Sequence, residues 1–161
     1  MNTITVRMGE LEVSNDPTSM LVTHALGSCI AVLVHDPVRH VGGMIHYMLP
    51  LSSLAPEKSE ARPAMFADTG VPLLFHRMYA LACQKSDLVV RVVGGASIRD
   101  DSATFEIGRK NYVMLRKMFW KVGVPIHAEA VGGTVARTAR LFVAGGRATV
   151  VASDSRQEVE L

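Results

Sequence analysis

The chain of 161 residues carries 17 Lys and Arg against 15 Asp and Glu, a formal net charge of +2 at pH 7. Its basic residues are dispersed along the sequence, so nucleic acid is not an expected partner. Hydrophobic residues make up 48%, enough for one sizeable core, but no run approaches the ~18 apolar residues of a membrane span. We therefore expect a protein that is not membrane-embedded and, because no secretory signal pattern is present, one that is cytoplasmic.

Short apolar or alternating runs predict strands along most of the chain. The predicted strands span residues 4–8, 11–14, 20–25, 29–35, 41–48, 88–93, 126–131, 140–143 and 149–152. The run 29–34 is apolar on both of its alternating faces, which predicts a strand that is covered on both sides of its sheet.

Two segments carry the period of an amphipathic helix instead. The first begins at Asp68 or Thr69, which are candidate N-caps, and runs to about Gln84. The second spans 108–122 and ends before Gly123, which suits a C-terminal cap. Each helix has a single apolar stripe, so each is expected to pack on a sheet.

The segment 51–65 is polar and contains prolines, and we interpret it as a mobile surface loop between the N-terminal strands and the first helix. The order of elements predicts the α+β class: residues 1–161 as a single layered domain of mostly antiparallel or mixed β-sheets, with two main helices packed on one face. This is an α/β/β sandwich.

A predicted type I turn at residues 36–39 begins with Asp-Pro and joins two strands into a hairpin. Pairing outward from this turn places Cys29 directly opposite His46. Directly opposed residues have Cβ atoms roughly 4.5 to 5.5 Å apart, a distance from which a thiol and an imidazole can form a hydrogen bond. A bulge at the glycine pair 42–43 would shift the register by one and separate them.

This pairing predicts a nucleophile and its general base. His46 would take the proton of the Cys29 thiol, giving a thiolate and an imidazolium whose attraction lowers the cysteine pKa. A third group must orient the imidazole, and the polar residues near in sequence are Thr23, His24 and Ser28. We choose Thr23, which lies on the strand before the corner and whose hydroxyl can accept the imidazole N–H.

The residues around the cysteine and the histidine complete the predicted site. Gly27 and Ser28 suit a tight corner that would expose the sulfur and leave backbone N–H groups free to stabilise an oxyanion. Met44 and Met48 lie two residues either side of His46, share its face of the strand, and are predicted to wall the pocket.

The same residues also have a purely structural interpretation. Free cysteine is among the most buried residue types, so Cys29 can be a core residue, as we expect for Cys83 near the end of the first helix. His35 and His40 flank the turn and are expected to face solvent. No histidine or cysteine falls in a close-pair ligand spacing, so no metal is expected.

Short blocks spread over nearly the whole chain form a further pattern. They are Thr-His-Ala-Leu-Gly-Ser-Cys at 23–29, Asp-Pro at 36–37, Gly-Met-Ile-His at 43–46, Met-Leu-Pro at 48–50, Phe-Ala-Asp-Thr at 66–69, Gly-Gly-Ala-Ser at 94–97, Ile-Gly-Arg-Lys-Asn at 107–111, and Gly-Gly at 132–133 with Arg137. In this order they resemble the CheD family of chemoreceptor glutamine deamidases. The blocks that end at Cys29 and begin at His46 are the most specific.

The resemblance implies a cysteine hydrolase that converts receptor glutamines to glutamates through a thioester, with Cys29, His46 and Thr23 as its triad and without a cofactor. It implies the cytoplasmic helices of methyl-accepting chemotaxis receptors as substrate and a CheC-type phosphatase as a further partner. Two residues depart from the family pattern, since Ala130 stands where Asp is usual and Thr134 where Asn is common.

Two other functions remain compatible with the sequence. The chain could be a non-catalytic partner of a CheC-type phosphatase that uses the same cleft only for docking, or a thiol hydrolase of peptide or small amides. Selectivity for glutamine over asparagine depends on the depth of the pocket and the shape of its loops, which the sequence does not give.

Overall fold

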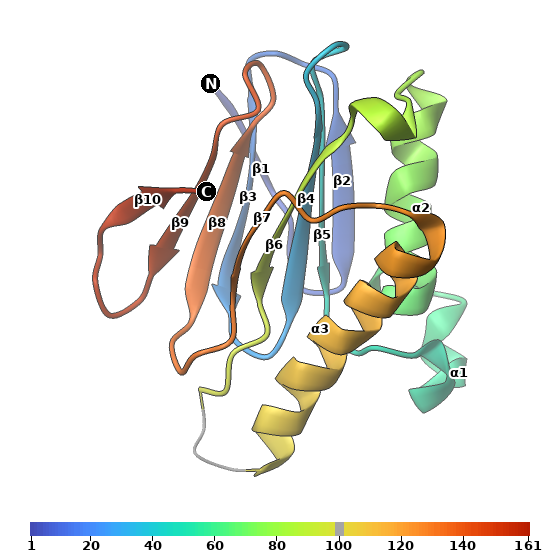
Figure 1. Cartoon of the computed structure of the whole chain (residues 1–161), viewed down its shortest axis with the longest axis vertical. Coiled ribbons are helices and arrows are strands. Elements are labelled where there is room, and N and C mark those ends of the chain that lie inside the picture. The colour runs from blue at the N-terminus through green and yellow to red at the C-terminus, as the bar shows by residue number, and fades with distance from the viewer. Residues whose placement is uncertain (99–101) are drawn as a thin grey trace.

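The computed structural model describes residues 1–98 and 102–161, which form two facing β-sheets and one layer of helices (Figure 1). Helices α2 (Ala67–Ala80) and α3 (Ser102–Val122) both cover one face of a first sheet, the central sheet. The second sheet, the outer sheet, covers the other face of the central sheet. The predicted α/β/β sandwich of the α+β class is confirmed.

Both sheets are mixed, with antiparallel pairs predominating. The outer sheet has the order β1 (Asn2–Thr5), β3 (Ser19–Leu26), β8 (Arg137–Phe142), β9 (Ala148–Ala152) and β10 (Glu158–Glu160). The central sheet has the order β2 (Glu10–Ser14), β5 (Val41–Tyr47), β4 (Ile30–Asp36), β6 (Val89–Gly94) and β7 (Ala128–Val131). The chain therefore crosses between the sheets three times near its N-terminus, from β1 to β2, from β2 to β3 and from β3 to β4.

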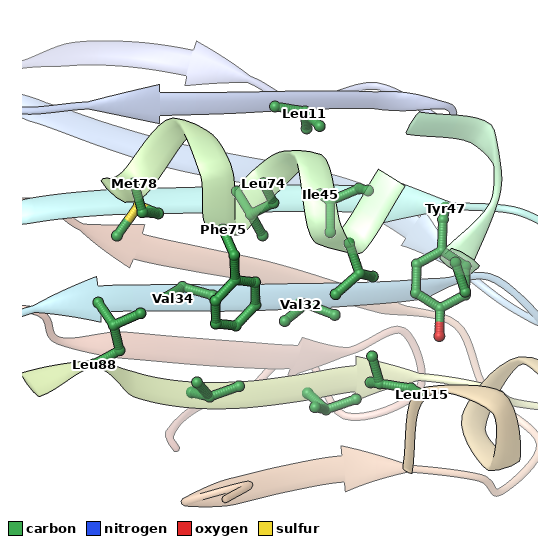
Figure 2. Packing of buried hydrophobic residues seen from close by; sticks show 14 of the residues in the cluster. Leu11, Val32, Val34, Ile45, Tyr47, Leu74, Phe75, Met78, Leu88 and Leu115 are labelled. Atoms are coloured by element: carbon green, nitrogen blue, oxygen red, sulfur yellow. The ribbon is translucent and has the colours of Figure 1, made fainter. Parts of the chain in front are cut away.

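Strands β4 and β5 are buried on both faces because the helices cover one side of their sheet and the outer sheet covers the other. On one side, residues such as Val32 and Ile45 pack against α2 and α3. Figure 2 labels members of this cluster: Leu11, Val32, Val34, Ile45, Tyr47, Leu74, Phe75, Met78, Leu88 and Leu115. On the other side Ala31, Leu33 and Met44 pack between the two sheets. Burying each large apolar side chain contributes about 1.5–3 kcal/mol.

The predicted strands are confirmed with shifted ends. β1 covers Asn2–Thr5 rather than 4–8, because from Val6 onward the chain leaves the outer sheet and crosses to β2. β10 was not predicted, since its sequence Glu-Val-Glu is short and mostly charged.

The helix ends differ from the prediction at three of four places. Phe66 is the N-cap of α2, while the Asp68 carboxylate accepts hydrogen bonds from the backbone and hydroxyl of Ser52. α2 ends at Ala80, and α3 begins at Ser102 rather than at 108. Gly123 follows α3 with a φ of +72°, which confirms its predicted role as a C-terminal cap. No helix in the described part of the chain is long and apolar enough to span a membrane.

The segment 51–65 lies at the surface over most of its length, as predicted, but it is not irregular. It contains short 3-10 turns at Ser52–Leu54 and Pro63–Met65 and the single helical turn α1 (Pro56–Ser59). Its end is buried and fastened to the chain after β5, because the carbonyl of Met65 accepts hydrogen bonds from the N–H groups of Met48 and Leu49. The polar composition reflects the exposed part of the segment and did not reveal this anchor.

The β4–β5 hairpin has a longer connection than predicted. Asp36 pairs with Val41, which leaves residues 37–40 as the loop, and His40 adopts a φ of +56°. The Asp36 carboxylate caps the turn by accepting the N–H groups of Val38 and Arg39. The pairing is therefore two residues out of the predicted register, a shift that keeps every side chain on its predicted face of the sheet.

Candidate active site

The three predicted triad residues come from different parts of the sandwich. Thr23 lies on β3 of the outer sheet, and His46 lies on β5 of the central sheet. Cys29 ends the bend that carries the chain from β3 across to β4. Thr23 is fully buried, His46 is 2% exposed and Cys29 is 9% exposed, so the three residues lie between the sheets and Cys29 is buried rather than at an exposed corner.

The register places Cys29 diagonally from His46 rather than directly opposite. Ala31 is the residue paired with His46, and Cys29 precedes Ala31 by two positions on the same face. Diagonal neighbours lie about 7–8 Å apart, a span that an imidazole ring and a thiol can reduce by pointing toward each other. The predicted direct pairing is wrong, and Nε2 of His46 forms no hydrogen bond with Cys29 or any other described residue.

Thr23 contacts the imidazole, as the choice of third residue predicted. Its Oγ1 lies 2.7 Å from Nδ1 of His46 and 2.5 Å from the carbonyl oxygen of Val6. The Thr23 hydroxyl has one hydrogen. It must lie between Thr23 Oγ1 and the carbonyl oxygen of Val6, because two oxygens this close would repel each other without a proton between them. Thr23 therefore donates to Val6 and accepts from Nδ1–H of His46.

This arrangement decides the tautomer of the histidine. With its proton on Nδ1, the imidazole presents an unprotonated Nε2, and Nε2 has no hydrogen-bond partner among the described residues. Burial lowers the pKa of His46 to about 4, so the ring is neutral at pH 7. Nε2 is then a buried base with a free lone pair.

The charge state of the cysteine differs from the prediction. Burial raises the pKa of the Cys29 thiol to about 11, opposed only by a hydrogen bond from its own backbone N–H. The expected thiolate and imidazolium pair with a lowered cysteine pKa is therefore wrong for the chain without substrate. Low polarity between the sheets disfavours both charges, so the resting pair is a neutral thiol and a neutral imidazole.

The corner at residues 27–29 is held in place by hydrogen bonds that its backbone carbonyl groups accept. The carbonyl of Gly27 accepts the N–H of Ala96, and that of Cys29 accepts the N–H of Gly95. In the described part of the chain, the N–H of Ser28 donates to no other residue and that of Cys29 only to its own sulfur. These two N–H groups thus have no other residue as acceptor, and their role in stabilising an oxyanion stays a prediction.

The methionines lie where the face of the strand predicted. Met44 is fully buried in the cluster between the sheets that also holds Cys29, and the half-buried Met48 packs against the same cluster. Both therefore belong to the layer between the sheets, and their role as walls of a pocket stays a prediction. The grooves identified on the described surface lie elsewhere, beside α2 and α3, and none is lined by these methionines.

The other cysteine and histidines take structural positions. His35 is buried rather than facing solvent, with Nε2 2.8 Å from the carbonyl of Val143 on the outer sheet, so this expectation is wrong. His40 is exposed, and its Nδ1 lies 2.8 Å from the carbonyl of Ala144. Cys83 is buried in the layer beneath the helices. Within the described residues no group of three His, Cys, Asp or Glu side chains could hold a metal ion.

Sequence reasoning missed one contributor to the site, the carbonyl of Val6. This group belongs to the chain crossing from β1 to β2, and the same crossing supplies the N–H of Gly9, which donates to the carbonyl of His46. A backbone group carries no side-chain signature, so only the fold could place it beside Thr23.

Comparison with known proteins gives the family of the chain. The family model described as CheD chemotactic sensory transduction matches residues 48–152, which is more than half of the sequence. The chain belongs to the CheD family. The matched region begins two residues after His46, so the triad positions rest on the geometry above and not on this match.

Curated relatives cover almost the full length of this family member. A protein of Anaeromyxobacter dehalogenans, named as a probable chemoreceptor glutamine deamidase, is 48% identical over 96% of this chain and 97% of its own. One of Syntrophus aciditrophicus with the same description is 50% identical over 95% and 96%. A third, of Solibacter usitatus, is 41% identical over 99% and 94%.

Proposed function

We propose that this chain is a protein-glutamine glutaminase that deamidates glutamines of chemotaxis receptors, with Cys29 as nucleophile, His46 as general base and Thr23 as the residue that orients it. The observation that supports this most strongly is the 2.7 Å contact between Thr23 Oγ1 and His46 Nδ1, which leaves Nε2 unprotonated between the sheets on the face that carries Cys29. The names of the curated relatives supply the substrate class.

The first half-reaction forms a thioester. His46 Nε2 removes the thiol proton as the Cys29 sulfur attacks the carboxamide carbon, and the carbonyl electrons move to oxygen. The N–H groups of Ser28 and Cys29 stabilise this oxyanion. The imidazolium then gives its proton to the departing nitrogen, the C–N bond breaks, and ammonia leaves.

The second half-reaction releases the product. Nε2 takes a proton from water as the water oxygen attacks the thioester carbon, and the C–S bond breaks with the proton returning to the Cys29 sulfur. The receptor now carries glutamate. Because the resting pair is neutral, charge develops only during each attack, and the Thr23 oxygen stabilises the transient imidazolium by accepting its Nδ1–H.

The proposed substrate also sets where the reaction occurs. Receptor cytoplasmic helices are the substrate that the family resemblance implies, which makes this chain a cytoplasmic enzyme, and residues 1–161 a single catalytic domain. Binding of a CheC-type phosphatase stays a separate prediction, which a binding assay with the Cys29→Ala variant tests independently of catalysis.

Mass spectrometry of receptor fragments tests the proposal directly. Wild-type protein should add ~1 Da per modified glutamine, as amide hydrolysis requires, and Cys29→Ala should add none while keeping its fold. Cys83→Ala, which removes the thiol beneath the helices, is the matched control and should act like wild type. An unmodified fragment with wild type, or equal modification by Cys29→Ala, would overturn the proposal, and activity on unrelated small amides alone would favour the broader thiol hydrolase.

A further inference from the structure

One buried side chain outside the triad joins the two segments that carry the cysteine and the histidine. Asn111 on α3 is fully buried, and its Nδ2 lies 2.9 Å from the carbonyl of Ser28 and 2.9 Å from the carbonyl of Met48. Ser28 directly precedes Cys29, and Met48 follows His46 by two residues. A single amide therefore bridges the corner of the nucleophile and the strand of the base.

The orientation of this amide is fixed by its neighbours. Both partners are carbonyl acceptors, so both hydrogens of Nδ2 are used and the amide cannot be flipped. Its Oδ1 has no hydrogen-bond partner among the described residues. Leaving a buried polar atom unpaired costs about 1–3 kcal/mol of stability. The net gain in stability from Asn111 is thus smaller than two hydrogen bonds suggest.

A second contact ties the same residue to β5. The hydroxyl of Tyr47, the residue after His46, donates to the backbone carbonyl of Asn111 at 2.7 Å. α3 can approach this closely because Gly108 has no side chain: a Cβ there would lie 2.8 Å from the carbonyl oxygen of Gly95. The side chain of Asn111 therefore binds Met48, just after β5, and its backbone carbonyl binds Tyr47, the last residue of β5.

The contact with Ser28 bears on the oxyanion site. In a trans peptide the carbonyl and the following N–H point in opposite directions. Holding the Ser28 carbonyl toward α3 therefore directs the N–H of Cys29 away from α3. The neighbouring carbonyls of Gly27 and Cys29 are held by backbone N–H groups, whereas Asn111 holds the Ser28 carbonyl with a side-chain donor.

We propose that Asn111 is a positioning residue of the deamidation reaction, which holds the Ser28–Cys29 peptide and the end of β5 in one geometry so that the sulfur, the oxyanion donor and Nε2 of His46 converge on the same carboxamide. The inference rests on the proposed function. It concerns the relative geometry of Cys29 and His46, and labelling of Cys29 reports on that geometry without receptor substrate.

Two substitutions separate positioning from stability. Asn111→Asp keeps the shape but presents an ionised carboxylate to two carbonyls, and Asn111→Leu keeps the approximate volume without donors. Thr149→Val on β9 is the matched control, because Thr149 is also fully buried and its Oγ1 lacks a partner among the described residues. For each variant we would measure kcat and KM on receptor fragments, thermal unfolding, and labelling of Cys29 by iodoacetamide against pH, followed by peptide mass spectrometry.

We expect both Asn111 variants to lose ~100-fold in kcat per folded molecule with KM nearly unchanged, the effect of a small misplacement of reacting groups. The pH profile of Cys29 labelling should change in both. Below the pKa of the new carboxyl, Asn111→Asp regains one donor and should recover part of its kcat, which Asn111→Leu cannot do. Thr149→Val should keep wild-type kcat and labelling.

A purely structural role gives a different result: a lower unfolding temperature with wild-type kcat per folded molecule and wild-type labelling at every pH. That result would overturn the inference. If Asn111→Leu fails to fold, Asn111→Asp at two pH values decides the question alone. If wild type releases no ammonia, the proposed deamidase activity fails instead, whereas the labelling profiles still report whether Asn111 sets the geometry around Cys29.

Discussion

At the scale of single residues, the site depends on one hydroxyl placed between a carbonyl and an imidazole. Thr23 gives its only proton to Val6 and can therefore act only as an acceptor toward His46. A carboxylate in this place would stabilise an imidazolium more strongly, but it would repel the Val6 carbonyl. The threonine sets the tautomer of His46 without placing a charge between the sheets.

Replacement of Thr23 by valine tests this role. Thr23→Val preserves the branched shape but leaves Nδ1–H of His46 unpaired, so we expect kcat to fall by roughly 100-fold, within the usual range for disabling a general base. Thr23→Ser keeps the hydroxyl and should stay within about tenfold of wild type. Steady-state ammonia release measures both, and equal activity of Thr23→Val and wild type would remove Thr23 from the triad.

The buried imidazole also makes stability depend on pH. The pKa of His46 is lowered by burial from 6.5 to about 4, so the unfolded chain binds a proton between these values and the folded chain does not. The stabilisation is complete above pH 6.5 and is lost as the pH falls toward about 4, a change of roughly 3 kcal/mol. Urea unfolding between pH 7 and pH 4.5 should show this loss.

Two variants identify the source of that loss. His46→Gln should show a weaker fall in the free energy of unfolding, with a remainder from buried His35, whose pKa is also lowered by burial. His24→Gln, at an exposed position of β3, should keep the wild-type dependence. A pH-independent free energy of unfolding for wild type would contradict a neutral buried His46.

At the scale of elements, the active corner depends on the start of the loop after β6. Gly94 ends β6 with a φ of +119°, and a Cβ at this position would lie 2.2 Å from the carbonyl oxygen of Cys29. Only glycine allows this approach, and the N–H of the next residue, Gly95, holds that same carbonyl. The end of β6 therefore shapes the corner that carries the proposed nucleophile, Cys29, through its backbone.

Gly94→Ala tests the importance of this close approach. We expect the backbone of the corner to move, with a loss of at least about 1–3 kcal/mol in the free energy of unfolding from the unfavourable φ and a severe loss of deamidation. Gly145→Ala is the matched control, because a Cβ there meets no described atom within 4 Å. Wild-type activity in Gly94→Ala, measured beside denaturant unfolding, would show that the corner tolerates displacement.

At the scale of the whole molecule, the proposed triad draws on both sheets and depends on packing one sheet against the other. Thr23 comes from the outer sheet and His46 from the central one, so contacts between the sheets hold the 2.7 Å hydrogen bond in place. The helices cover the opposite face of the central sheet (Figure 1). Loss of packing between the sheets should thus affect the site without any change in its residues.

Leu141→Ala opens a cavity in this layer. Leu141 on β8 is fully buried between the sheets, and we expect its truncation to cost about 2–5 kcal/mol. Leu54→Ala, at a side chain that is 60% exposed, should change stability by no more than about 0.5 kcal/mol. Urea unfolding followed by near-UV and by far-UV circular dichroism measures both variants, and a single coincident transition is expected for one domain over residues 1–161.

The sequence by itself determined which faces of the strands meet. Alternation with a period of two placed Cys29, Met44 and His46 on one face, and this result survived a register shift of two residues because the shift preserves parity. Helix periodicity placed two helices on one face of a sheet, and Gly123 marked the end of α3 correctly. These features follow from local chemistry that each segment carries with it.

The tertiary structure decided what depends on contacts between distant segments. The left-handed conformation of His40 and the Asp36 cap lengthened the hairpin loop and set the register. Burial between the sheets reversed the expected shift of the Cys29 pKa. The Val6 carbonyl comes from the crossing after β1 and the Asn111 amide from α3, because backbone groups and buried amides find their partners only once the layers have packed.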